Sequence, residues 1–187
     1  GPSHTWSANK PGNVTLESFD DDVFEFTIIS YSYATCSVKA KNKSISGDII
    51  IPATTDIDGV TYTVTSIPAD AFHDCSGITS ISIPYTVTSI ETSAEGGYGP
   101  FDGCNNLTQI TLPYEVNTLT GYLEIGAYFF SNTGVKEAYF PSFAYISDYG
   151  IFSLAHNLEK VTVDPNQETM YSYDGMLFWT NDYGNPE

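Results

Sequence analysis

The chain has 187 residues, which is enough for one domain, or for a small cap joined to a short repeat array, but not for two large domains. Asp and Glu outnumber Lys and Arg 23 to 6, the formal net charge is -17, and all six cations are lysines. Because phosphate recognition favours the arginine fork and a polyanion would be repelled, nucleic acid and anionic membranes are poor partners.

The first 22 residues are expected to be a tag remnant and a linker, or a loosely tied strand. Gly1 to His4 look like the scar of a cleaved tag, and Asp20 to Asp22 close a segment that carries Pro, Gly and Ser. No apolar run in the sequence approaches the ~20 residues that cross a bilayer, so we expect no direct membrane insertion. A native signal peptide is expected to have been removed upstream of residue 1.

Residues 23–66 are expected to form an N-terminal antiparallel β cap with a partial repeat. Val23 to Tyr33 is rich in Phe, Ile and Tyr, Cys36 to Lys41 alternates in polarity, and Ile49 to Ile51 matches the end of the repeat described next. Asp58-Gly59 lies between two β-rich runs and is a hairpin signal. A stack of coils needs such a cap, because its open end would expose the core.

Residues 67–165 are expected to form an array of repeats, each opened by a phenylalanine and closed by a proline. The first copy comprises Phe72, Cys75, Ile78, Ile81, Ile83 and Pro84. The second copy comprises Phe101, Cys104, Leu107, Ile110, Leu112 and Pro113. The third, with two weakened positions, comprises Phe129, Asn132, Val135, Ala138, Phe140 and Pro141. The fourth comprises Phe152, Ala155, Leu158, Val161 and Val163, and its proline comes one residue late, at Pro165.

The spacing within a copy predicts stacked coils. Apolar residues two apart, such as Ile81 and Ile83, lie on one face of a short strand. One coil cannot bury its apolar edge alone, so successive coils must stack as parallel ladders ~4.8 Å apart. We predict a mainly β fold, a solenoid of about four to five coils with an N-terminal antiparallel β cap. Its interior column should comprise Phe72, Phe101, Phe129 and Phe152.

The second half of each coil is also expected to repeat, and the last residues to add a partial copy. The segments in question are Val64 to Ile67, Val87 to Ile90 and two looser versions, Val116 to Leu119 and Phe143 to Ile146. Residues 166–187 are expected to be a C-terminal partial repeat, in which Met170 to Trp179 forms a strand pair about Asp174-Gly175.

The strings VTSIPADAFHDCSGITSISIP (Val64 to Pro84) and VTSIETSAEGGYGPFDGCNNLTQITLP (Val87 to Pro113) resemble the BspA-type leucine-rich repeat of bacterial and protozoan surface proteins. The resemblance extends from Ile49 to about Phe178. The chain departs from the family pattern through two insertions and through loss of Cys in the third and fourth copies. The resemblance implies a leucine-rich-repeat solenoid in a secreted or cell-surface protein that adheres to, or contacts, a host.

The cysteines are expected to be structural. Cys75 and Cys104 occupy the same slot of successive copies, and that slot holds Asn132 and Ala155 in the next two. A position that accepts these three residue types is best explained by size, so we expect a column of small buried side chains rather than a disulfide. Cys36 is expected to be an inert buried thiol, and the spacings do not fit a zinc site.

Two insertions, Thr92 to Pro100 and Thr120 to Tyr128, are expected to emerge side by side on one edge of the solenoid. Neighbouring loops rich in Tyr and Gly are what an adaptable recognition surface uses. The candidate ligand-binding residues are Tyr98, Tyr122, Tyr128 and Glu95 in these loops, with Tyr85 and Tyr114 as a second row after the repeat prolines. The alternative is that these tyrosines only pack the insertions against the coils.

The sequence favours binding over catalysis. His73 and His156 fall at different phases of the repeat and pair with no nucleophile, so we expect no catalytic, cofactor-binding or metal site. We expect a non-catalytic secreted or cell-surface adhesion module whose partner is a protein or glycan on a host or neighbouring cell. Two alternatives stay open. One is a structural spacer that displays another domain, and the other is a carbohydrate-active protein that uses Glu91, Glu95 and Glu124.

Overall fold

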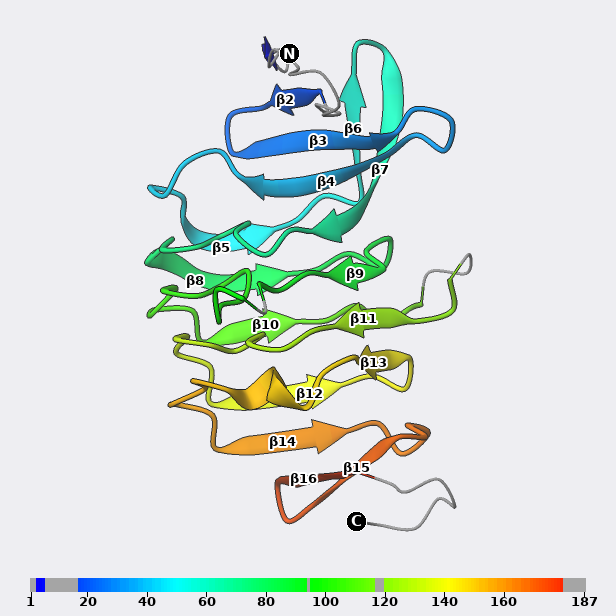
Figure 1. The fold of residues 1–187 in the computed structure, drawn as a ribbon. Helices are drawn as coiled ribbons and strands as arrows, with labels where there is room; N and C mark the ends of the chain where they lie inside the picture. The colour runs from blue at the N-terminus through cyan, green and yellow to red at the C-terminus, as the bar shows by residue number, and fades with distance from the viewer. Residues whose placement is uncertain (1–2, 6–16, 94, 117–119, 180–187) are drawn as a thin grey trace.

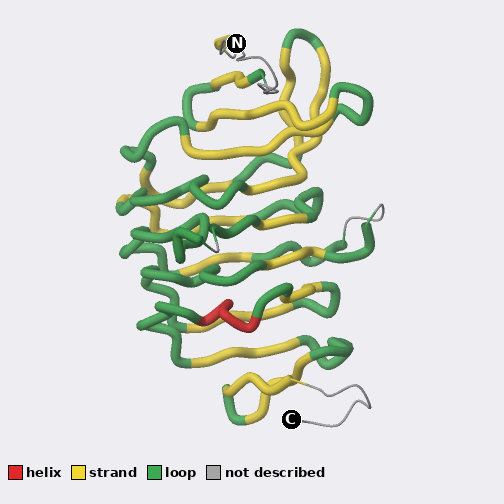
Figure 2. Tube along the Cα trace, viewed as in Figure 1, coloured by secondary structure: helices red, strands yellow, loops and turns green. Residues whose placement is uncertain are grey.

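The computed structural model describes residues 3–5, 17–93, 95–116 and 120–179. The described chain is mainly β, and its strands stack in successive coils from the N-terminal to the C-terminal end (Figure 1). Its one helical segment is the short 3-10 helix η1 (Tyr149–Phe152), drawn in red in Figure 2. None of the described helices has the length and apolar character that crossing a membrane requires.

Two sets of parallel strands run along the stack. The first set comprises β5 (Ser46–Ile50), β8 (Gly77–Ser82), β10 (Gln109–Thr111), β12 (Glu137–Phe140) and β14 (Lys160–Val163). The second set comprises β7 (Val60–Ile67), β9 (Ser89–Ile90), β11 (Leu123–Ile125) and β13 (Ala144–Ile146). Pairs such as Ile81 with Ile110 in the first set, and Ile67 with Ile90 in the second, are in parallel register. The spacing of two residues between apolar positions therefore produces the strands that the sequence predicts.

The N-terminal strands are antiparallel and join the second set directly. They are β1 (Ser3–Thr5), β2 (Ser18–Asp20), β3 (Phe24–Ser30) and β4 (Thr35–Ala40). β4 then pairs in parallel with β7. Of the two alternatives for residues 1–22, a linker or a loosely tied strand, β2 fits the strand, because it pairs with β3 and its Phe19 side chain is only 2% exposed and belongs to the core. Burial of this ring holds the segment in the sheet.

Both predicted hairpins are present. β6 (Thr54–Ile57) turns into β7 through Asp58 and Gly59, whose φ angles are 50° and 82°. β15 (Met170–Tyr173) turns into β16 (Met176–Trp179) through Asp174 and Gly175, with φ angles of 51° and 77°. Two successive residues in the left-handed region form the tight turn that fits the twist of antiparallel strands, and Asp-Gly is a favoured pair for this turn.

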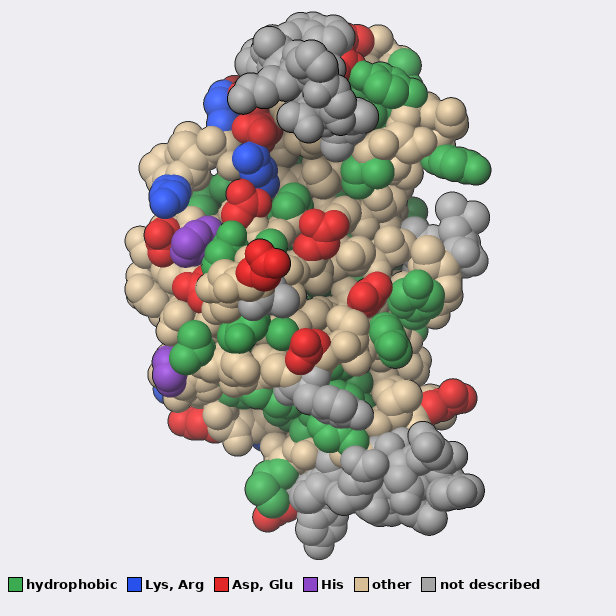
Figure 3. All heavy atoms as spheres, in the orientation of Figure 1, with side chains coloured by type: hydrophobic (Ala, Val, Ile, Leu, Met, Phe, Trp, Pro, Cys, Tyr) green, Lys and Arg blue, Asp and Glu red, His purple; other side chains and the backbone are tan. Residues whose placement is uncertain are grey.

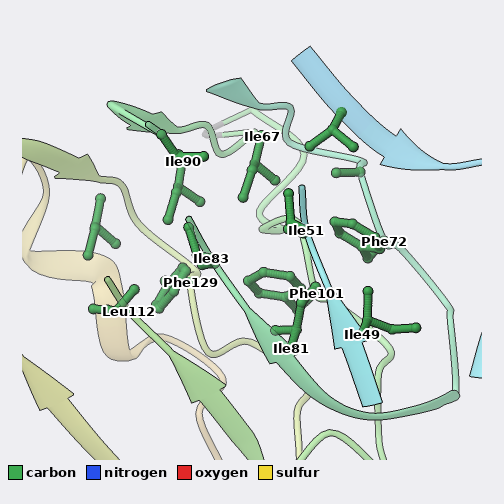
Figure 4. Packing of buried hydrophobic residues seen from close by; sticks show 14 of the residues in the cluster. Ile49, Ile51, Ile67, Phe72, Ile81, Ile83, Ile90, Phe101, Leu112 and Phe129 are labelled. Atoms are coloured by element: carbon green, nitrogen blue, oxygen red, sulfur yellow. The ribbon is translucent and has the colours of Figure 1, made fainter. Parts of the chain in front are cut away.

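A column of phenylalanine rings fills the interior. The Phe72 and Phe101 rings stack with centroids 5.8 Å apart, and Phe101 meets Phe129 edge to face at 5.7 Å (Figure 4). Phe152 continues the column, but its stacking partner is Phe130, with centroids 6.1 Å apart and an interplanar angle of 5°. Phe129 and Phe130 are both buried and contact each other at 4.7 Å. The column is thus the one predicted, with one additional ring in the third coil.

The third copy of the repeat is shifted by one residue from the predicted alignment. In each copy, the residue two positions after the phenylalanine of the turn has a positive φ angle. These residues are Asp74, Gly103, Asn132 and Leu154. Phe130 and Thr133 therefore occupy the turn positions expected for Phe129 and Asn132. Asn tolerates positive φ better than most residues, which explains why Asn132 takes the turn position. The small buried slot then holds Thr133 in place of Asn132, beside Cys75 and Cys104.

The second half of the coil before the third copy also differs from its predicted position. Leu123–Ile125 forms β11 and pairs with Ser89 and Ile90, so the role expected for Val116–Leu119 falls to β11. Leu123 and Ile125 are fully buried, and this alternating burial fixes the register. Residues 117–119 of the predicted segment lie outside the described residues. The longer connection consequently precedes β11, whereas the insertion at Thr92 follows β9.

Candidate functional site

The two insertions leave their coils at different phases, so the structure does not bring all their tyrosines together. The Tyr98 ring stacks on His73, with centroids 5.3 Å apart and an interplanar angle of 10°. Tyr128 lies beside the same loop, because a Cβ atom on Gly99 would collide with the Tyr128 carbonyl. Both tyrosine side chains are half-buried, while Glu95 is exposed in the loop. In this loop the tyrosines therefore act largely as packing residues.

Tyr122 lies at the other end of β11 from Tyr128. Its ring contacts Tyr145 edge to face, with centroids 6.0 Å apart, and both rings are about half exposed. The pair borders a small groove of about 380 Å³ that also includes Asn166 and Gln167. The Gln167 amide is already occupied, because its Nε2 donates to the carbonyls of Pro141, Ser142 and Ala144. The Gln167 Nε2 is therefore not available to bind a ligand in this groove.

Tyr85 and Tyr114 follow equivalent prolines but have different surroundings. Tyr85 is 51% exposed and Tyr114 is 90% exposed. Only Tyr114 of the two lines a groove of about 740 Å³ between β10 and β12, together with Tyr139. A volume of this size lies in the range of ligand sites. This groove, which we call the β10/β12 groove, is the candidate site.

The β10/β12 groove exists because the first set of strands is interrupted. β10 pairs with β8, and β12 pairs with β14, but these pairs belong to separate sheets. No backbone hydrogen bond joins β10 to β12, although both strands lie within the described residues. The second set continues without interruption through β9, β11 and β13 past the same junction. The coils therefore separate on one side only.

The core explains this one-sided opening. Phe72 stacks directly on Phe101, but the ring of Phe129 lies between those of Phe101 and Phe130 at the junction that opens. An extra buried ring adds volume that a close-packed interior can accommodate only by shifting its backbone. Ala138 is the small residue in the column formed by Ile81, Ile110 and Val161, so little apolar volume faces the gap from β12.

A side chain replaces backbone pairing at the turn of the same junction. The earlier turns are linked by the Asp74 amide, which donates to the Asp102 carbonyl at 2.8 Å. At the opened junction the Asp102 carboxylate instead accepts from Ser131 Oγ at 2.8 Å and from Asn132 Nδ2 at 3.3 Å. Ser131 is fully buried, so this carboxylate provides its hydroxyl with a needed acceptor.

Two tyrosines and several polar groups line the β10/β12 groove. The Tyr139 hydroxyl donates to Asp164 Oδ2 at 3.1 Å, which fixes the ring at the groove. Partial burial and then this hydrogen bond raise the pKa of Tyr139, so its hydroxyl stays a donor. Lys136 and Glu137 add one charge of each sign, and Ile110 and Ala138 contribute half-buried apolar surface. The site combines aromatic surface with polar groups that can orient a ligand.

The protein as a whole is strongly acidic. Asp and Glu side chains are spread over the face shown in Figure 3, in keeping with the net charge of -17. Such a charge distribution attracts cationic partners over several ångströms and repels anionic ones.

The three cysteines are buried free thiols. Cys104 Sγ donates to the Phe72 carbonyl of the preceding coil at 3.0 Å. Burial raises the pKa of Cys36 and of Cys104 to about 12, so both thiols stay protonated and poorly nucleophilic. In the described part of the chain, no group of three or more His, Cys, Asp and Glu side chains could hold a metal ion.

The carboxylates of the carbohydrate-active alternative have separate environments. Glu91 Oε1 accepts from Ser66 Oγ at 3.4 Å, and Glu124 lies in β11 beside Ser89. Glu95 lies in the exposed loop after β9, and none of the three lines the β10/β12 groove.

Comparison with known proteins identifies the repeat. The sequence profile of the BspA type leucine rich repeat region matches residues 65–174 in 6 copies. A leucine-rich repeat protein from Bacteroides capillosus is 24% identical over 79% of this chain and 98% of its own, with a TM-score of 0.62. The comparison with curated proteins finds no match.

Two other solved structures are longer than this chain. The pneumococcal vaccine antigen PcpA is 15% identical over 87% of this chain and 53% of its own, with a TM-score of 0.52. A leucine-rich repeat protein from Bacteroides ovatus is 21% identical over 82% of this chain and 43% of its own, with a TM-score of 0.53. These identities show a shared fold, while the profile match spans more than half of the chain. The chain therefore belongs to the BspA-type leucine-rich repeat family.

Proposed function

We propose that this chain is a non-catalytic binding module that recognises a protein or glycan through the β10/β12 groove. The observation that carries the proposal is the groove itself, where the first set of strands is interrupted and two tyrosines flank the gap. Tyrosine supplies a large amphipathic contact area at a low cost in conformational entropy. Tyr139 is already held in place by Asp164, so a ligand need not order it on binding.

We place the module outside the cell or at a cell surface. The family is typical of surface proteins, and the composition, rich in Tyr, Ser, Thr and Asn and poor in charged side chains, suits an extracellular β protein. A vaccine antigen with the same fold supports this location.

We further propose that the strands of residues 23–66 act as the N-terminal cap of a solenoid of about four to five coils. β3 and β4 bury Phe24, Phe26 and Val38 against the end of the stack, and the β6–β7 hairpin adds Ile57. These side chains cover apolar surface that the first coil would otherwise expose.

Binding is tested by incubating the chain with arrays of host-matrix proteins and of glycans. The Tyr114→Ala variant is expected to lower retention of the captured partner by about 10-fold or more, because truncating an aromatic hot spot costs about 2 kcal/mol or more and about 1.4 kcal/mol is already tenfold. Tyr85→Ala is the matched control, since Tyr85 follows the equivalent proline outside the groove. Its retention should equal that of the unmodified chain, and both variants should melt at the same temperature as the parent.

A structural spacer would retain no partner on either array, and that result would refute the proposal. Equal losses for Tyr85→Ala and Tyr114→Ala would show that the partner binds elsewhere on the surface.

A further inference from the structure

The ligand of the β10/β12 groove must lie on its side chains, because the two backbones are too close together to admit a strand. The Cα atoms of β10 and β12 approach within 8 Å of each other. Two strands that flank a third one lie about 9–10 Å apart, which is twice the spacing of paired strands. Main-chain pairing therefore does not define the ligand, and the side chains that line the groove do.

The charged side chains of the lining balance each other. Lys136 and Glu137 are neighbours in the chain, and both are exposed at the groove. Within the described residues, neither side chain forms an ion pair. A cationic ligand would meet Lys136, and an anionic ligand would meet Glu137 and the net charge of -17. A neutral ligand is the class that meets no like charge here.

The polar groups at one end of the groove include both donors and acceptors. The Lys136 ammonium only donates, the Glu137 carboxylate only accepts, and the Gln109 amide does both. Within the described chain, Gln109 Nε2 has one weak hydrogen bond, to Thr111 Oγ1 at 3.5 Å, so its second hydrogen and the amide oxygen remain for a ligand. A sugar hydroxyl donates and accepts at the same oxygen, so neighbouring hydroxyls can satisfy all three groups.

The other end of the groove offers the faces of aromatic rings. Tyr139 lies two residues after Glu137 on the same side of β12, and Tyr114 follows β10. Tyr139 is about half exposed and Tyr114 is almost fully exposed. The face of an aromatic ring is electron-rich, so it attracts the C–H groups that cover the apolar face of a sugar ring. This end of the groove therefore suits a stacked sugar.

The separation of the two ends sets the smallest ligand. Two residues of an extended strand cover ~6.6 Å, which is the step from Glu137 to Tyr139 along β12. A sugar ring that stacks on the tyrosines occupies one end, and a second ring linked to it reaches the polar groups at the other end. A chain of sugars therefore uses the groove more completely than a single sugar does.

We infer that the β10/β12 groove takes a neutral glycan chain of two or more sugars, which lies along the strands. One ring packs on Tyr114 and Tyr139. The hydroxyls of the next ring form hydrogen bonds with Gln109, Lys136 and Glu137. This inference rests on the binding function proposed above and specifies its ligand.

The test is a glycan array probed with the full chain. The array carries neutral oligosaccharides of glucose, mannose, galactose or xylose, with sialylated and sulfated glycans beside them, and retention is expected on neutral glycans alone. Calorimetric titration then compares the best neutral disaccharide with its monosaccharide. The disaccharide should bind about 10-fold or more tightly. Its affinity should be the same at low and high salt, because salt screens only interactions between charges.

Two variants with opposite changes of charge test the lining. Glu137→Gln and Lys136→Met should each weaken binding of the neutral disaccharide about 10-fold, because each loses a hydrogen bond between a charged group and a hydroxyl. Glu124→Gln is the matched control for Glu137→Gln, since it removes the same charge outside the groove and should leave binding unchanged. All three variants should melt at the temperature of the parent.

The signs of the two effects separate the classes of ligand. An anionic ligand would bind Lys136→Met less tightly and Glu137→Gln more tightly than the parent, and a cationic ligand would do the reverse. Either pattern would overturn this inference. Binding of a neutral glycan that neither variant weakens would overturn it as well, because the glycan would then lie elsewhere.

The arrays also separate this inference from the proposed function. Capture of a matrix protein that is lost with Tyr114→Ala, without any retained glycan, would overturn the inference and leave the proposed binding function intact. Retention of no partner on the glycan and protein arrays would overturn both.

Discussion

The same coils build both sets of parallel strands, yet one set is continuous at the junction where the other opens. β9, β11 and β13 pair in sequence, and the Glu124 amide donates to the Thr88 carbonyl at 2.9 Å. β10 and β12 lie on the other side of the same coils and do not pair. The difference shows that the stacked coils can accommodate extra side-chain volume in the core by losing strand pairing on one side only.

The side chains behind the two sets account for the difference. Ile67, Ile90 and Ile125 are buried at matching positions of the continuous set, so each coil presents the same volume to the next. Behind the interrupted set, Phe129 adds a ring between Phe101 and Phe130. A close-packed core transmits this extra volume to the backbone, and the strands with the small Ala138 are the ones that separate.

The largest expected effect comes from the ring column. Phe101→Ala should lower the free energy of unfolding by about 3–5 kcal/mol, because Phe101 is fully buried between two rings. Phe129→Ala should cost less, since the opened junction can close into the vacated space. Denaturant unfolding measures both values, provided that the slope with denaturant is unchanged. An equal or larger loss for Phe129→Ala would mean that its ring does not hold the junction open.

A smaller effect is expected at the turn of the opened junction. Asp102→Ala removes the acceptor of the buried Ser131 hydroxyl and should cost about 1–3 kcal/mol. Asp102→Asn keeps one side-chain oxygen and should recover part of that loss. Thermal or denaturant unfolding of the two variants checks the ranking. Identical stability of Asp102→Ala and the parent would show that the carboxylate does not link the coils.

The smallest effect concerns a carboxylate on the paired part of the first set. Asp48 Oδ1 accepts from Ser80 Oγ at 2.7 Å and from Thr79 Oγ1 at 3.0 Å, and these hydrogen bonds lower the pKa of Asp48. A lowered folded-state pKa contributes stability that is present above the unfolded-state pKa and is lost as the pH falls through the folded-state value. Asp48 is fully exposed, so the contribution to stability is small.

An NMR titration of the Asp48 carboxyl tests this assignment. Ser80→Ala should bring its pKa back toward the ordinary range of an aspartate, while Ser82→Ala on the same strand should leave it unchanged. A pKa that stays low in Ser80→Ala would assign the effect to another group.

The repeated part of the fold was predictable because its signals are local. The spacing of Phe72, Ile81 and Ile83 gives the turn and the strand, and the two Asp-Gly pairs give the hairpins. Two registers were predicted wrongly. Val116–Leu119 was predicted to pair with Val87–Ile90. Leu123–Ile125 pairs there instead, because Leu123 and Ile125 bury alternate side chains in the core. Phe129-Phe130 offered two rings for one turn position, and the left-handed preference of Asn132 decided between them.

The candidate site was only partly predictable. Tyr114 was among the predicted binding residues, but its partner Tyr139 was not, because the outward positions Ser82, Thr111 and Tyr139 share no chemical theme in the sequence. The opening between β10 and β12 depends on how three rings pack across coils, which no short motif encodes. The one sequence feature that could have indicated the opening is Ala138, a small residue at a position that holds Ile81, Ile110 and Val161 in the other copies.

The most direct test of the interrupted set is amide hydrogen exchange of the chain without any ligand. Exchange should be fast at Ile110 and Tyr139, whose amides face the groove, and slow at Leu123 and Ser147, which donate across β11 and β13 at 3.0 Å. Protection at Ile110 and Tyr139 equal to that at Leu123 and Ser147 would show that the two sets are alike, and would contradict this account.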